Sequence, residues 1–220
     1  MVMFERERTS AEIVMYALYL YFLGLSFRST SRALEPFNEN KRSHVSVWNW
    51  VQQFNPKIAY SRKTRVTAFL IDETMIQIGN NNAWLWIAIE PIHSLVLGVY
   101  ISRHRNMLVA ESFLGSLVKS YGKHSVYSDG GTWYPEACSS SLGLEHKLHS
   151  SFEKSIIERS IQYSKDRTEC FDDYYPCRHM DCCELSHVYK WTHLFMFMRN
   201  AAIRHVKFTT MIRSLRGDQS

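Results

Sequence analysis

"RVTAFLIDETMIQIG", residues 65–79, is the stretch that decides the fold of this chain. Apolar and β-branched residues dominate it, and this pattern predicts a β-strand. Asp72 and Glu73 lie near its middle, where a buried carboxylate costs free energy unless a partner compensates it. The stretch therefore predicts a strand that carries an acidic site, and the rest of the chain must supply the compensating group.

Two more predicted strands follow, "AWLWIAIE" at 83–90 and "LVLGVYIS" at 95–102, each after a short turn. Three strands joined in this way predict an antiparallel meander. Helices and strands then alternate, as a helix over 106–122, a strand over 124–131, a short helix or turn over 132–143, a strand over 144–150 and a helix over 153–171. The order β-β-β-α-β-α-β-α is typical of the α/β, ribonuclease H-like mixed sheet.

The residues before this sheet predict a small helical domain. Residues 1–58 contain three helical patterns, and the last, "SHVSVWNWVQQF" at 43–54, follows a short helix and a tight loop. This arrangement is typical of a helix-turn-helix that reads DNA with its second helix. Val47, Trp50, Val51 and Phe54 form its apolar face, and the candidate DNA-reading residues are Ser46, Trp48, Asn49 and Gln52. The alternative is a three-helix packing module without a ligand.

Positive charge is concentrated in the same region. Ten of the 26 Lys and Arg residues but only five of the 21 Asp and Glu residues lie in residues 1–65, which leaves sixteen of each for residues 66–220. A basic head on a neutral body favours a polyanion-binding module over an ordinary solvated surface. We therefore predict a helix-turn-helix domain at 1–58, a linker at 59–65, a catalytic domain at 66–200 and a tail at 201–220.

Three acidic residues fall on matching elements of the predicted sheet. Asp72 lies on the first strand, Asp129 ends the fourth, and Glu158 lies on the helix after the fifth. Three converging carboxylates repel one another unless cations bind, and hard divalent ions prefer such oxygen ligands. The pattern predicts two Mg²⁺ or Mn²⁺ ions that support phosphoryl transfer. Glu153, on another helix face, is the second choice for the third acid.

Five segments of the chain carry a resemblance to a known family. They are "IDET" at 71–74, "WLWIAIE" at 84–90, "SRHRNMLVAESFL" at 102–114, "YSDGGTWYPEA" at 127–137 and "IIERSIQYSKDR" at 156–167. The sequence resembles the DDE transposases of bacterial and archaeal insertion sequences, closest to the IS6-type group, within the ribonuclease H-like integrase superfamily.

The resemblance implies Asp72, Asp129 and Glu158 as the catalytic metal ligands. It also implies that Lys165 and Arg167 lie near DNA phosphate. The connection between Asp129 and Glu158 has 28 residues, fewer than is usual in the family, which leaves open a degenerate and inactive copy.

The functional hypothesis is a DNA transposase that binds the terminal repeats of its element and performs metal-dependent hydrolysis and strand transfer. Its expected partners are double-stranded DNA, as element ends and target, and further copies of the chain in a dimer or higher oligomer, with no membrane. We expect it in the cytoplasm at the nucleoid. A non-catalytic helix-turn-helix regulator and a ribonuclease H-like nuclease are the alternatives.

Three other features carry expectations. The apolar run 13–25 is too short to span a bilayer and predicts a buried helix. The five cysteines form no regular framework, which favours a reducing compartment, and four of them (Cys170, Cys177, Cys182 and Cys183) crowd late in the chain. Zinc binding there is the alternative to ordinary loop cysteines. The apolar segment 193–208 predicts a final helix that packs on the sheet or on a partner subunit.

Overall fold

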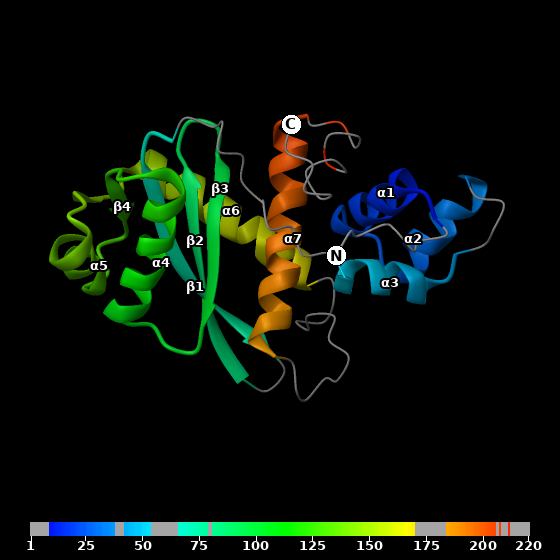
Figure 1. Cartoon of the computed structure of the whole chain (residues 1–220), viewed down its shortest axis with the longest axis horizontal. Coiled ribbons are helices and arrows are strands. Elements are labelled where there is room, and N and C mark those ends of the chain that lie inside the picture. Colours follow the sequence, from blue (N-terminus) through cyan, green and yellow to red (C-terminus); the bar gives the residue numbers. More distant parts are fainter. Residues whose placement is uncertain are drawn as a thin grey trace. The chain divides into compact units, whose positions relative to one another are not determined.

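The computed structural model describes residues 9–37, 42–53, 66–78, 81–169, 184–205, 207 and 211. The chain divides into two compact units, Met1–Ala59 with Lys190–Ser220, and Tyr60–Tyr189 (Figure 1). The predicted linker at 59–65 lies outside the described residues. None of the helices in the described ranges is long and apolar enough to cross a membrane.

The unit formed by Tyr60–Tyr189 contains a five-stranded mixed sheet with the strand order β3-β2-β1-β4-β5. The first three strands pair antiparallel, whereas β4 pairs parallel with β1 and β5 pairs parallel with β4. The strands are β1 (Phe69–Ile78), β2 (Asn81–Glu90), β3 (Leu95–Ser102), β4 (Val126–Ser128) and β5 (His146–Leu148). This topology confirms the predicted ribonuclease H-like fold.

Helices cover both faces of this sheet, with α4 in front of it and α6 behind it in Figure 1. They are α4 (Met107–Tyr121), α5 (Trp133–Ala137), η2 (Cys138–Leu142) and α6 (Ser151–Glu169). Phe69 and Ile71 of β1 share a buried apolar cluster with Phe113 of α4 and Tyr134 of α5. Because side chains alternate along a strand, Ile71 and Glu73 face this cluster, and Asp72 faces the opposite side.

The other unit is helical, with α1 (Ala11–Phe22), α2 (Phe27–Leu34), η1 (Glu35–Phe37), α3 (His44–Gln53) and most of α7 (Leu185–Ile203). Ser43 caps α3, since its Oγ accepts the Ser46 N–H at 3.3 Å. Val47, Trp50 and Val51 are buried, which confirms the predicted apolar face of this helix.

The last helix packs against the first within this helical unit. Trp191 of α7 donates its indole N–H to the Tyr21 hydroxyl at 3.0 Å, and both side chains are buried. The Phe22 ring lies 5.5 Å from the Trp191 ring and 5.8 Å from the Phe195 ring. These contacts join α7 to α1, and the predicted packing on the sheet or on a partner stays a prediction. Residues 190–200, predicted to belong to the catalytic domain, therefore fall in the helical unit.

Candidate functional site

Strand register places the first two acids side by side. Phe69 pairs with Val126 and Leu70 with Tyr127 in the parallel ladder between β1 and β4. Continuing that register by two residues sets Asp72 opposite Asp129. Neighbouring strands lie about 4.8 Å apart, and facing residues of parallel strands point to the same side. Asp129 directly follows β4, at the end of the ladder beyond which Asp72 continues β1, and its negative charge acts on Asp72.

Asp72 is an acid whose charge is poorly compensated by the protein alone. Burial, together with the negative charges of Glu73 and Asp129, raises its pKa from 3.8 to about 7. The Glu73 N–H, which donates to Asp72 Oδ1 at 2.8 Å, and the Arg105 guanidinium act in the opposite direction. A carboxylate in this state favours any added cation, because a cation stabilises its charged form.

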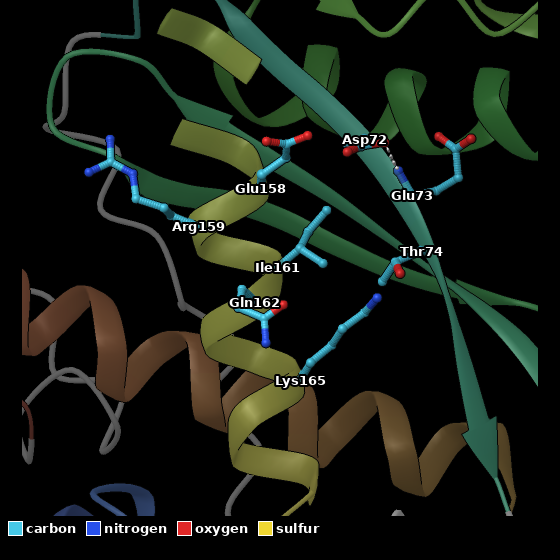
Figure 2. A pocket seen from close by; sticks show the side chains of 8 residues that line it. All are labelled: Asp72, Glu73, Thr74, Glu158, Arg159, Ile161, Gln162 and Lys165. Carbon is cyan, nitrogen blue, oxygen red and sulfur yellow. Dashed lines mark hydrogen bonds between the residues drawn. The ribbon is translucent and has the colours of Figure 1, made fainter. Parts of the chain in front are cut away.

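The third acid lies across a groove from Asp72. The groove has a volume of about 490 Å³ and runs between β1 and α6. Figure 2 shows the Glu158 carboxylate of α6 on the side that faces β1, with the Lys165 ammonium directed toward Thr74. The groove is lined by Asp72, Glu73, Thr74, Glu158, Arg159, Ile161, Gln162 and Lys165. The groove thus joins two of the predicted acids to one of the predicted cations.

Glu158 and Glu153 have different roles in α6. The Glu153 carboxylate accepts the Ser150 N–H at 2.7 Å, and Ser150 Oγ accepts the Glu153 N–H at 3.4 Å. This reciprocal pair is a capping box that fixes the start of the helix. The Glu158 side chain is 59% exposed, and its nearest cation is Lys154 at 3.8 Å. The geometry therefore favours Glu158 over Glu153 as the third acid.

Asp72 is the acid that both Asp129 and Glu158 approach. It is close enough to Asp129, which directly follows β4, to feel its charge, and it shares the groove with Glu158. In the described ranges, however, no three side chains of Asp, Glu, His or Cys gather closely enough to hold one metal ion. Asp72 thus has Asp129 near it on one side, and Glu158 lies across the groove from it on α6.

Glu73 is a buried acid whose partners the sequence analysis did not identify. Its Oε1 accepts the Nε–H of Arg105 at 2.7 Å and forms an ion pair with one terminal nitrogen of the same guanidinium at 2.6 Å. Its Oε2 accepts the Tyr134 hydroxyl. Both oxygens are therefore occupied on the core side of β1. The alternation of the strand signals this burial, because Glu73 shares its face with Ile71, but it does not identify the partners.

Two indoles enclose the Arg105 guanidinium. Its central carbon lies 4.7 Å from the Trp84 ring of β2 and 4.3 Å from the Trp133 ring of α5. Stacking of this kind stabilises a cation and restricts its movement. Gly131 makes room for the Trp133 indole, because a Cβ at that position would lie 2.8 Å from the ring.

The loop after β4 holds Asp129. Asp129 Oδ1 accepts the Gly131 N–H at 3.0 Å, and Ser128 Oγ accepts the Gly130 N–H at 3.2 Å. Gly130 has a φ of 93°, a conformation that favours glycine. Ser128 Oγ also lies 2.8 Å from Nε2 of His146, whose ring stacks on Tyr134. This loop is thus connected to the same buried tyrosine that contacts Glu73.

The predicted DNA-binding residues differ in exposure. Asn49 on α3 is exposed, whereas Ser46, Trp48 and Gln52 are partly exposed. Lys165 is partly exposed in the groove. Arg167 is only 6% exposed, so its guanidinium does not lie at the protein surface in this structure. The late cysteines and His179 fall in residues 170–183, outside the described residues.

Comparison with known proteins adds a family match. Residues 66–170 match the family model of the DDE domain of IS240-type transposases. An uncharacterized protein of Methanocaldococcus jannaschii is 31% identical over 199 residues, which cover 90% of this chain and 90% of the relative. The family match begins at the start of the sheet unit and contains all five strands and α4, α5 and α6.

Matches among solved structures include two viral proteins. The chain is similar to the simian T-cell lymphotropic virus intasome in complex with PP2A regulatory subunit B56 gamma, with 16% identity and a TM-score of 0.47. That match covers 84% of this chain and 65% of the intasome chain, a little under two thirds of its length. The HTLV-2 integrase catalytic core domain in complex with magnesium, in its trimeric form, has 14% identity, a TM-score of 0.43, and coverage of 62% and 84%.

Proposed function

We propose that this chain, which belongs to the DDE transposase domain family, is a DNA transposase that cuts and joins DNA strands at the ends of its element. The helical unit would bind the terminal repeats. The sheet unit would hydrolyse a phosphodiester bond at the element end. The freed 3′-hydroxyl would then attack a phosphodiester of target DNA, which joins the element strand to the target and releases a target 3′-hydroxyl. Family membership supports the reaction class, and the geometry around Asp72 supports the assignment of the residues.

The observation that carries this proposal is the position of Asp72. Register sets it beside Asp129, and the groove between β1 and α6 sets it opposite Glu158. An acid held at high pKa by burial, with a second acid at its side, is typical of a site that functions with a bound cation. A regulator without catalysis has no requirement for such a costly pair.

The residues present fit Mg²⁺ or Mn²⁺, because Asp72, Asp129 and Glu158 offer only carboxylate oxygens. We propose that these three acids hold two ions. Bound divalent ions would lower the pKa of the attacking hydroxyl and stabilise the leaving oxygen. Glu73 is excluded as a ligand in this arrangement, since Arg105 and Tyr134 occupy both of its oxygens.

The other side chains of the groove would position the DNA strand. Lys165 lies on the same face of α6 as Glu158, seven residues further on, and would contact a phosphate as a point charge. In the helical unit, the exposed amide of Asn49 would contact base edges. Pairing two element ends requires two active sites, so the proposal includes a dimer or a higher oligomer.

A cleavage assay tests this function. The full chain is incubated with duplex DNA that carries the terminal repeats flanking its reading frame, with Mg²⁺ or with EDTA. We expect strand cleavage only with the metal, and Asp72→Asn should abolish cleavage while terminal DNA is still bound. Asp166→Asn, an exposed acid one helical turn from Gln162 on α6, is the matched control and should cleave normally.

The same assay separates the alternatives. Terminal binding without cleavage at any metal concentration would favour a regulator or a degenerate copy. Cleavage of RNA–DNA hybrids in preference to duplex DNA would favour a ribonuclease H-like nuclease. Either result would overturn the proposed transposase activity.

A further inference from the structure

Behind Asp72, on the core face of β1, lies a buried polar network that the proposed reaction does not use directly. Its centre is the Glu73 carboxylate, whose side chain has no exposed surface. Arg105 reaches Glu73 from the loop after β3, and Tyr134 reaches it from α5. The network therefore ties β1 to two segments that are 32 and 61 residues away in the chain.

This network is rigid for physical reasons. Arg105 gives Glu73 Oε1 one hydrogen bond and an ion pair, and the indoles of Trp84 and Trp133 lie 4.7 and 4.3 Å from its guanidinium carbon. Burial and the negative charge of Glu73 raise the pKa of Tyr134 well above its ordinary value, so its hydroxyl remains a donor. Charge-assisted bonds of this kind are shorter and stronger than neutral ones. Glu73 thus has little freedom to move.

The restraint on Glu73 passes directly to Asp72. The peptide N–H of Glu73 donates to Asp72 Oδ1 at 2.8 Å, so the orientation of this peptide sets the orientation of the Asp72 carboxylate. Within the described part of the chain, no other hydrogen bond reaches the Asp72 carboxylate, which leaves Oδ2 for a cation. A movement of the Glu73 side chain would rotate this peptide and displace Oδ2.

The network also reaches the second acid. The Tyr134 ring stacks on His146 with an angle of 11° between the ring planes, and His146 Nε2 lies 2.8 Å from Ser128 Oγ. Ser128 directly precedes Asp129 and holds the Gly130 N–H. Tyr134 therefore lies between the residues that support Asp72 and those that support Asp129.

We propose that Arg105 and Tyr134 are positioning residues which, through Glu73, hold Asp72 in the orientation that binds the divalent cation. They do not touch the reacting atoms. This inference rests on the proposed function, because it assigns a role relative to the proposed metal site. Groups that orient metal ligands are commonly worth 10- to 100-fold in metal affinity or activity, and we expect roughly 10-fold here.

The test is a Mn²⁺ titration of the full chain, followed by calorimetry. Tyr134→Phe removes one hydrogen bond to Glu73 and leaves the ring in place. Tyr121→Phe is the matched control, because Tyr121 is a partly buried tyrosine that donates to the Leu97 carbonyl at 3.0 Å on a different part of the sheet unit. We expect Tyr134→Phe to weaken Mn²⁺ binding by roughly 10-fold, and Tyr121→Phe to leave it unchanged.

Kinetics provide a second readout that a merely structural role would not change. Because Tyr134 is buried and does not contact DNA in this proposal, Tyr134→Phe should lower kcat and leave the KM for DNA unchanged. If Tyr134→Phe does not fold, Arg105→Lys replaces it, since lysine keeps the charge but lacks the planar fork. That variant should also bind Mn²⁺ about 10-fold more weakly.

The outcomes separate the two proposals. Wild-type affinity for Mn²⁺ in Tyr134→Phe or in its replacement, Arg105→Lys, would overturn the positioning role and leave the metal site intact. An equal loss in Tyr134→Phe and Tyr121→Phe would also overturn it, since the effect would then be general destabilisation. If Asp72→Asn binds Mn²⁺ as tightly as the wild type, the proposed metal site itself fails.

Discussion

Replacing Asp72 by Asn should stabilise the metal-free protein, and the gain should grow with pH. Burial raises the pKa of Asp72 from 3.8 to about 7, so the folded state binds its proton more tightly than the unfolded state does. Such a group costs little stability below the unfolded pKa. Its cost increases as the pH rises from the unfolded pKa toward the folded pKa, because only the unfolded state loses its proton in that range, and the cost is complete above the folded pKa.

The size of this stability change follows from the shift in the pKa of Asp72. Between pH 5 and pH 7 the cost rises by about 1.4 kcal/mol per pH unit, or nearly 3 kcal/mol in total, and it levels off above pH 7. The groove beside Asp72 admits solvent, so we expect between about 1 and 3 kcal/mol. The charged groups near Asp72 are Glu73, Asp129 and Arg105, with Glu158 and Lys165 on α6 across the groove. Asp72→Asn removes this cost, because the amide stays neutral.

The assay is urea unfolding of the wild type and Asp72→Asn in EDTA at pH 5 and pH 8. The free energy of unfolding of Asp72→Asn should exceed that of the wild type by more at pH 8 than at pH 5, and the difference should be between about 1 and 3 kcal/mol. Mg²⁺ should then stabilise only the wild type, by about 1.4 kcal/mol for each tenfold excess over Kd. Asp166→Asn, an exposed replacement, should change stability by less than about 0.5 kcal/mol. An equal effect of Asp72→Asn at both pH values would refute the reasoning.

Three further outcomes are expected. Asn49→Ala should reduce the preference for terminal repeats over random DNA more than it reduces affinity for random DNA, which competition binding measures, and equal losses would contradict base reading. Lys165→Ala should lower the slope of log K against log salt by about 1, and an unchanged slope would exclude a phosphate contact. Trp191→Phe should destabilise the helical unit by about 1 kcal/mol, because it removes the buried hydrogen bond to Tyr21, and thermal unfolding measures this change. A loss of stability smaller than the loss in Tyr121→Phe would argue against the Trp191–Tyr21 contact.

Local patterns were sufficient to predict the sheet. The strands at 83–90 and 95–102 lie within β2 and β3 as observed, because alternation and short turns are properties of neighbouring residues. The start of α3 was predictable for the same reason, since Ser43 caps it from the adjacent position. The order of these elements then predicted the fold, and with it the place of Asp72 beside Asp129.

The last helix shows where such reasoning stops. An apolar segment must pack on something, but its composition does not say on what. The Trp191 indole finds the Tyr21 hydroxyl across 170 residues of sequence, and no local pattern specifies that pair. The helical unit is thus built from both ends of the chain, and a fragment that ends near residue 58 would lack α7.

Asp72 and Glu73 show why one dipeptide requires two explanations. Adjacent residues of a strand point to opposite faces, so two neighbouring acids must be compensated separately. On the core face Arg105 and Tyr134 contact both oxygens of Glu73 and lower its pKa, although burial keeps that pKa above its ordinary value. On the groove side Glu158 lines the same groove as Asp72, the charge of Asp129 acts on Asp72, and the Asp72 pKa is near 7. The sheet thus uses one acid to stabilise its core and leaves the other in need of a cation, which is the physical basis for assigning the metal-dependent chemistry to Asp72.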